Sequence, residues 1–131
     1  MSSRQAGRLP AVHLVPTDRA GSHIIDEHTV CAAIEAIPEP PVVAAWAHWF
    51  DVLSDPTRLR LLLAIQAAGP LSVTDLAVAT DIRPDTVSQT LRHLRADHTV
   101  TAERSGRVIR YTLADTVISR LLEHPTKPVL S

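Results

Sequence analysis

The twenty residues 81–100, DIRPDTVSQTLRHLRADHTV, contain two hydrophobic periods that belong to different kinds of secondary structure. Val87, Leu91 and Leu94 recur at i, i+4 and i+7, which is the spacing of one face of an α-helix. Pro84 suits the first turn of that helix because its backbone is already fixed in a helical φ. Towards residue 100 the period changes to two, so the helix is expected to pass directly into a β-strand.

The residues that follow predict a β-hairpin. Val100 and Ala102 alternate with polar residues, Ser105-Gly106 is a turn sequence, and a second alternating run covers residues 108–113. Three arginines lie at or near the expected tip, at positions 104, 107 and 110. The hairpin is therefore expected to be basic.

A shorter helix is expected just before the quoted stretch. Ser72 suits an N-cap, Asp75 follows three residues later as in a capping box, and Leu76 and Ala77 form a buried side. A tight turn near residues 80–83 then joins this helix to the next one. Further helices are predicted over residues 26–37, from Pro41 to about 53, over 56–68, and over 115–124.

Composition limits the class of protein. The 131 residues, 45% of them hydrophobic, provide one ordinary core, and a net charge of −1 gives no overall attraction to anionic partners. Local clustering is different, because residues 83–110 hold six arginines against three acidic residues. A single cysteine, no apolar run of ~18 residues and no secretory signal predict a cytoplasmic protein without a membrane partner.

The chain is expected to have three parts. Residues 1–22 lack a sustained period and predict a flexible N-terminal arm, residues 23–124 a single domain, and residues 125–131 a C-terminal tail. Trp46, Trp49 and Phe50 lie close together in the sequence and predict a packing centre.

Helix, tight turn, second helix and basic hairpin, in that order, are the layout of a winged helix-turn-helix. The second helix has the shape to enter a DNA major groove, with its apolar stripe on the core and hydroxyl, amide and guanidinium groups outside. Arginines of the hairpin suit contacts with phosphates or the minor groove, which add affinity but little sequence choice.

Four segments together resemble a known family. LSDPTRLRLLLAI, LSVTDLA, DTVSQTLRHLR and ERSGRVIRYTLAD are similar, in this order and spacing, to the signature segments of ArsR/SmtB bacterial transcriptional repressors. The resemblance covers roughly residues 42–123. It implies a mainly α fold with a small β-hairpin, which is the winged helix-turn-helix. It implies also a homodimer, in which the first core helix and the last helix make much of the dimer contact. It also implies an inverted-repeat operator and release by an inducer, often a metal ion.

The resemblance implies a set of DNA contacts. In the second helix they are Thr86, Ser88, Gln89, Thr90 and Arg92, and in the wing Arg107 and Arg110. Thr90 departs from the family, because many relatives have histidine at this position.

The metal sites usual in the family are incomplete in this chain. At the start of the helix-turn-helix, where relatives have cysteines, Ser72 and Thr74 lack sulfur and only Asp75 remains. In the last helix, Asp115 is followed by Val117 rather than by the expected histidine.

The stretch HIIDEHTVC, residues 23–31, offers other donors. His28 and Cys31 share a helix face, and together with His23 and Asp75 they form a candidate set for zinc or another divalent transition metal. The alternatives are that Cys31 is a small core residue or a redox-sensitive thiol. A weaker candidate set joins His124 to Asp115 and Glu123, and His13, His48, His93 and His98 are assigned no site.

Three functional hypotheses follow. The first is a DNA-binding repressor that a metal releases from its operator, and the second is a regulator that is metal-independent or responds to Cys31 oxidation. The third is a protein-interaction winged helix that does not bind DNA. Catalysis is not expected, because there is no glycine-rich phosphate loop and no nucleophile with an ordered base.

Overall fold

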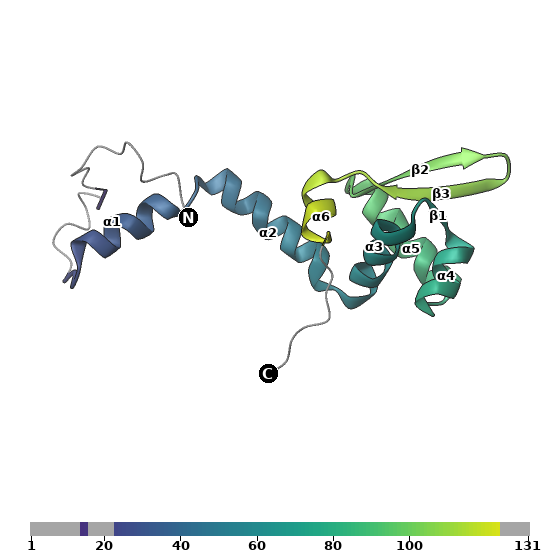
Figure 1. Ribbon diagram of the computed structural model, residues 1–131, viewed down its shortest axis with the longest axis horizontal. Coiled ribbons are helices and arrows are strands. Elements are labelled where there is room, and N and C mark those ends of the chain that lie inside the picture. The colour runs from purple at the N-terminus through teal and green to yellow at the C-terminus, as the bar shows by residue number, and fades with distance from the viewer. Residues whose placement is uncertain (1–13, 16–22, 124–131) are drawn as a thin grey trace. The chain divides into compact units, whose positions relative to one another are not determined.

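The computed structural model describes residues 14–15 and 23–123 of the chain. Its elements are α1 (Glu27–Ala36), α2 (Pro40–Ser54), α3 (Pro56–Ala68), β1 (Leu71–Ser72), α4 (Val73–Thr80), α5 (Pro84–Ala96), β2 (Val100–Ser105), β3 (Val108–Leu113) and α6 (Thr116–Leu121) (Figure 1). Two compact units, Met1–Ala45 and Trp46–Ser131, divide the chain within α2.

Only Leu14 and Val15 of the predicted arm belong to the described residues, and the predicted tail lies outside them. Val15 is buried, and the Leu14 N–H lies 3.5 Å from Cys31 Sγ on α1. Among the described residues, no single helix is long and apolar enough to span a membrane. Taken together, α1 and α2 reach the required length and hydropathy, but the pair is bent at the break between them.

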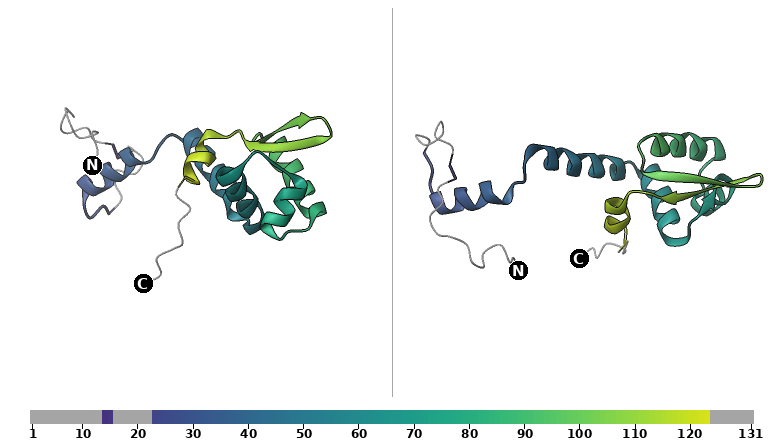
Figure 2. Two further views of the ribbon diagram at one scale, coloured as in Figure 1. Left: turned by 45° about the vertical axis from the view of Figure 1, so that its right-hand side comes forward. Right: turned by 90° about the horizontal axis from the view of Figure 1, so that it is seen from above.

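The second unit has one core, to which α3, α4, α5 and α6 each contribute. Leu61 and Leu62 of α3, Leu76 of α4, Leu91 of α5 and Ile118 of α6 all have no exposed surface. Figure 2 shows α3, α4 and α5 gathered beside the β-strands. The predicted mainly α winged helix-turn-helix is confirmed, with α4 and α5 as the two helices of the motif.

The sheet has three strands, in the order β1-β3-β2 and antiparallel throughout. The hairpin of β2 and β3 pairs Val100 with Leu113 at its base and Ser105 with Val108 beside the loop. The third strand, β1, pairs Leu71 with Tyr111 and was not predicted. Two residues are too few to show a period, so this strand is defined by its partner rather than by its own sequence.

The predicted starts of α3 and α4 are confirmed by their caps, whereas α2 begins at Pro40, one residue before the predicted start. Asp55 accepts from the Arg58 N–H at 2.9 Å at the start of α3, and Ser72 Oγ accepts from the Asp75 N–H at 3.2 Å at the start of α4. Arg58 also donates from Nε to the Val52 carbonyl at 2.9 Å. This bond satisfies a carbonyl at the end of α2 and fixes the bend into α3.

The last helix is shorter than its apolar period predicts. It ends at Leu121, where the Leu122 N–H is shared between the carbonyls of Ile118 at 3.1 Å and Ser119 at 3.3 Å. Such shared bonds are common where a helix tightens at its end. The predicted end at residue 124 was wrong because the helix closes at Leu121 through these shared bonds, which an apolar period does not indicate.

The aromatic cluster of α2 is only partly buried. Trp46 packs edge-on against Trp49, with ring centroids 5.1 Å apart, and against Phe50 at 5.7 Å. Even so, Trp46 is 39% exposed and Phe50 56% exposed. The cluster therefore packs within itself and leaves an apolar surface uncovered in the single chain.

A left-handed residue forms the turn between α4 and α5. Asp81 has φ 55 and ψ 40, and the N–H groups of Asp81 and Ile82 both donate to the Ala77 carbonyl. This is the position after a helix that glycine occupies most often. An L-residue with a Cβ is strained there, and aspartate tolerates the strain better than most residues.

We predict that Asp81→Gly increases the free energy of unfolding, whereas Asp81→Ala decreases it. The two variants should differ by about 1 kcal/mol, since alanine at positive φ carries a steric penalty that glycine avoids. Urea denaturation of both variants measures this difference. Equal stabilities would mean that residue 81 is not left-handed in solution.

Candidate nucleic-acid interface

The core determines which side of α5 a ligand can reach. Val87 and Leu91 have no exposed surface, and Leu94 is only 2% exposed. The opposite side carries the polar face of α5, which we define as Thr86, Ser88, Gln89, Thr90 and Arg92. All of these except the half-buried Thr90 are exposed. The predicted contacts on this helix therefore lie together on one accessible surface.

The first turn of α5 is also exposed. Arg83 occupies the N-cap position and makes no side-chain capping bond, and the Asp85 carboxylate accepts from the Thr86 N–H at 2.9 Å. Arg83 Nε lies 3.5 Å from Asp85 Oδ1, with both side chains more than 70% exposed. An ion pair so open to water contributes little to stability and leaves both groups available to a partner.

The wing presents its two predicted arginines differently. Arg107 lies in the two-residue loop after Gly106, whose φ of 65 allows the tight reversal, and it is exposed. Arg110 is exposed on β3 and lies directly opposite Glu103 of β2. A cross-strand carboxylate partly offsets the charge of Arg110, so Arg107 is the less compensated cation.

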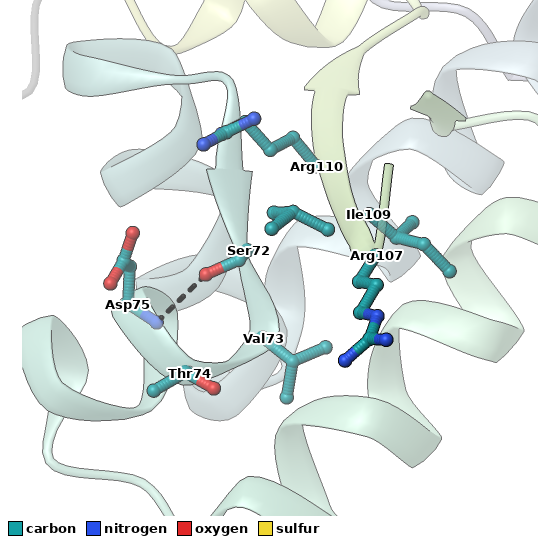
Figure 3. Close-up of a pocket in the computed structure, with 8 residues that line it drawn as sticks. Ser72, Val73, Thr74, Asp75, Arg107, Ile109 and Arg110 are labelled. Atoms are coloured by element: carbon teal, nitrogen blue, oxygen red, sulfur yellow. Dashed lines mark hydrogen bonds between the residues drawn. The ribbon is translucent and has the colours of Figure 1, made fainter. Parts of the chain in front are cut away.

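An open cavity of about 470 Å³ separates the start of α4 from the wing (Figure 3). It is lined by Ser72, Val73, Thr74 and Asp75 on one side and by Arg107, Val108, Ile109 and Arg110 on the other. This corner corresponds to the family metal site that the sequence lacks. One carboxylate beside two guanidinium groups is a poor environment for a cation, so the donor set here does not fit a metal.

The remaining candidate ligands lie in the first unit. His28 is exposed and Cys31 is half-buried one turn later on α1, while His23 is exposed before the helix. In the part of the chain that the structure describes, no group of three His, Cys, Asp or Glu side chains could hold a metal ion. His23, His28 and Cys31 lie in the first unit and Asp75 lies in the second, so the four-residue set and a site shared with a partner both stay predictions. His124 of the weaker set lies outside the described residues.

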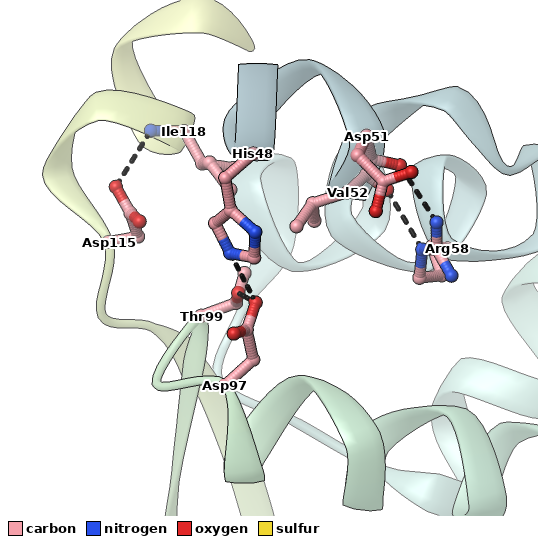
Figure 4. Close-up of polar contacts among 8 residues, drawn as sticks. All are labelled: His48, Asp51, Val52, Arg58, Asp97, Thr99, Asp115 and Ile118. Carbon is pink, nitrogen blue, oxygen red and sulfur yellow. Dashed lines mark hydrogen bonds and ion pairs between the residues drawn. The ribbon is translucent and has the colours of Figure 1, made fainter. Parts of the chain in front are cut away.

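A polar contact that the sequence did not indicate joins α2 to the end of α5 (Figure 4). His48 Nε2 lies 2.8 Å from Asp97 Oδ2, although the two residues are 49 positions apart. Asp97 is the C-cap of α5. His48 was assigned no site because a lone histidine on a helix gives no local signal, and only the folding of α2 onto this end of α5 brings the pair together.

Comparison with known proteins agrees with this architecture. A helix-turn-helix domain family model matches residues 53–100. The SmtB homolog of Synechocystis sp. is 43% identical over 75 residues, 57% of this chain and 56% of the relative. NmtR of Mycobacterium tuberculosis is 42% identical over 77 residues, 59% of this chain and 63% of the relative. The match thus spans less than two thirds of either relative.

A longer match decides the family. The transcriptional repressor SmtB of Mycobacterium tuberculosis is 32% identical over 103 residues, which cover 77% of this chain and 76% of the relative. The chain belongs to the ArsR/SmtB family. Among solved structures, the antimony-specific repressor AntR is 38% identical, with a TM-score of 0.61 over 65% of this chain and 77% of AntR. Apo-NmtR is 39% identical, with a TM-score of 0.58 over 67% of this chain and 73% of NmtR.

The family relationship confirms the resemblance found in the four sequence segments. These relatives are named as transcriptional regulators.

An acid-sensitive cap holds the start of α1. Asp26 Oδ2 accepts from Thr29 Oγ1 at 2.7 Å and Oδ1 from the Thr29 N–H at 3.1 Å. The side-chain bond from Thr29, followed by the backbone bond, lowers the pKa of Asp26 below its ordinary value of 3.8. A carboxyl with a lowered pKa stabilises the folded state above its unfolded pKa, and this stabilisation is lost as the pH falls through the lowered value.

We predict that the N-terminal turn of α1 keeps its cap at pH 4 and loses it on further acidification. The Thr29 amide resonance, followed by NMR during an acid titration, reports this loss directly. Thr29→Val removes the stronger of the two bonds, so it should move the transition to higher pH. An identical transition in Thr29→Val would contradict the assigned cause.

Proposed function

We propose that this protein is a DNA-binding transcriptional repressor that binds an inverted-repeat operator as a homodimer and is released by an inducer. The polar face of α5 carries this proposal. It combines hydroxyl, amide and guanidinium groups on the outside of a helix whose other side is fixed in the core, as direct contact with base edges requires.

The wing supports the same function. Arg107 and Arg110 are exposed on a short hairpin beside the helix-turn-helix, where contacts to phosphates or the minor groove would add affinity. A surface of this composition also argues against the alternative of a protein-interaction winged helix. Large exposed apolar patches commonly mark protein-binding sites, whereas the outside of α5 is polar and basic.

A homodimer would cover the apolar surface of α2. Val42, Val43, Trp46 and Phe50 are between 39% and 56% exposed, and their spacing places them along one side of the helix. Leu121 of α6 is a further large apolar residue with 38% exposure. Two-fold pairing buries the same patch on both subunits and presents two copies of α5 to one duplex.

We predict that Arg92→Ala lowers affinity for an operator duplex from the protein's own promoter by about 5- to 150-fold per contact. This corresponds to the 1–3 kcal/mol that a good bidentate base contact provides. Fluorescence anisotropy at a fixed salt concentration, with a scrambled duplex in parallel, measures both affinity and sequence preference.

Arg120→Ala is the matched control, since Arg120 is an exposed arginine on α6, outside the proposed DNA surface. It should leave operator affinity within twofold of the wild type, which is about the error of such a measurement. If Arg92→Ala and Arg120→Ala behave alike, the assignment of α5 as the recognition helix is wrong.

The inducer is the less defined part of the proposal. AntR is named as antimony-specific, and this relationship supports a response to a metal or metalloid. Of the candidate donors, His28 and Cys31 share one face of α1 and provide an imidazole and a thiol that suit zinc or a similar ion. We propose that these two residues, with His23, supply ligands and that a second subunit completes the set.

We predict that native mass spectrometry of the dimer in the presence of zinc detects bound metal, and that Cys31→Ser abolishes it. Asp75→Asn is the discriminating control. Because two arginines line the same cavity as Asp75, this substitution should leave the bound metal unchanged. Loss of metal in Asp75→Asn would restore the four-residue set, and retention in Cys31→Ser would exclude Cys31 as a ligand. Absence of bound metal from the wild-type dimer would favour the metal-independent alternative.

A further inference from the structure

We propose that His48 and Asp97 form a proton-dependent link between α2 and the end of α5, which makes operator binding stronger at about pH 6 than at about pH 8. The inference rests on the proposed DNA-binding function and assigns His48 as a positioning residue for the recognition helix. His48 itself does not belong to the proposed DNA surface.

The first argument is the position of the contact. His48 lies on the part of α2 that belongs to the second unit, where Val52 is buried and Trp49 and Leu53 pack against the core only in part. The 2.8 Å contact to Asp97 adds a polar attachment directly to the last turn of α5. The contact therefore depends on the spacing of these two helices.

The second argument is electrostatic. The C-terminus of a helix carries a partial negative charge, so a carboxylate at the C-cap is disfavoured and a cation is favoured. Asp97 occupies this unfavourable position at the end of α5. A protonated His48 beside it would neutralise the carboxylate and interact well with the helix end, whereas a neutral imidazole offers only a hydrogen bond.

The neighbouring elements carry other charged and titratable groups. Figure 4 shows Asp51 on α2, Arg58 on α3 and Asp115 at the start of α6. The sequence adds His93 and Arg95 in the last turn of α5 and His98 immediately after Asp97. Arg58 donates to the carbonyl of Asp51 at 2.8 Å, and Asp115 accepts from two N–H groups of α6. Arg58 and Asp115 therefore have structural roles of their own. Asp97 is the group in direct contact with the ring of His48.

The third argument is the connection beyond Asp97. Thr99, which is 1% exposed, places its Oγ1 3.4 Å from the same Asp97 oxygen. The Thr99 carbonyl accepts from the N–H groups of Ala114 at 2.9 Å and Asp115 at 3.3 Å, at the start of α6. The link therefore joins the end of the recognition helix to both helices that carry the exposed apolar surface.

Exposure limits the size of the effect. The side chains of His48 and Asp97 are 52% and 39% exposed, so water screens the pair and its strength is that of a partly exposed ion pair. We expect a contribution of about two- to fivefold per subunit, or about tenfold for a dimer that carries two links. The link is thus a modulator of affinity and not an on-off switch.

The test is a pH series of operator affinity for the wild type, His48→Gln, Asp97→Asn and the double variant, at constant ionic strength. Glutamine keeps a hydrogen-bond donor but cannot be protonated, and asparagine keeps an acceptor without charge. We expect affinity of the wild type to fall about tenfold from pH 6 to pH 8, with most of this change lost in each single variant. The double variant should show no further loss.

The variant His93→Gln controls for the titration of other histidines near DNA. His93 lies in the last turn of α5, close in sequence to Asp97, and its substitution should leave the pH dependence caused by the link unchanged. If His48→Gln retains the wild-type pH dependence, or if the two single effects add in the double variant, the link is wrong while DNA binding stands. If the wild type binds the operator at no pH, the proposed function is overturned together with the link.

Discussion

Burial of one stripe of α5 is the constraint on which the rest of the structure depends. With Val87, Leu91 and Leu94 held in the core, the remaining side chains of the helix have no place except the surface. The preceding helix, α4, is also held in place at its C-terminal end. Thr80 is buried, its hydroxyl donates to the Leu76 carbonyl at 2.6 Å, and its carbonyl accepts from Arg60. The accessible polar face of α5 is therefore a consequence of core packing and not a separate feature.

Charge placement then decides what this surface can bind. The whole chain has a net charge of −1, and a long-range field cannot attract it to DNA. Six arginines against three acidic residues over 83–110 give a local positive excess, and the wing holds part of it beside the helix-turn-helix. Such a protein is expected to bind DNA through short-range contacts, with an affinity that depends on how well the helix is positioned.

Periodicity and capping patterns were sufficient to predict most of the fold. Pro84, Ser72 and Asp55 act locally, through fixed φ or through bonds to amides three residues away, so their roles could be inferred without tertiary information. The two-residue strand β1 and the pairing of His48 with Asp97 depend on contacts between distant segments, which no local pattern contains. The polar face of α5 was predictable for the same reason as the helix. The position of Arg107 and Arg110 beside Asp75 was not, because it depends on the tertiary fold that brings the wing to the start of α4.

Under the proposed function the recognition helix responds to events elsewhere, and among the described elements α2 is bonded both to α3 and to the end of α5. It begins four residues after α1, which carries His28 and Cys31, and its other end is bonded to α3 through Arg58 and to the end of α5 through His48. Asp97 lies at the helix end where a carboxylate is least favourable, so the contact with His48 does more than fill a surface position. A helix end that is stabilised in part by a contact from a second element responds to changes in that element. Coupling between an inducer site and DNA requires an element of this kind.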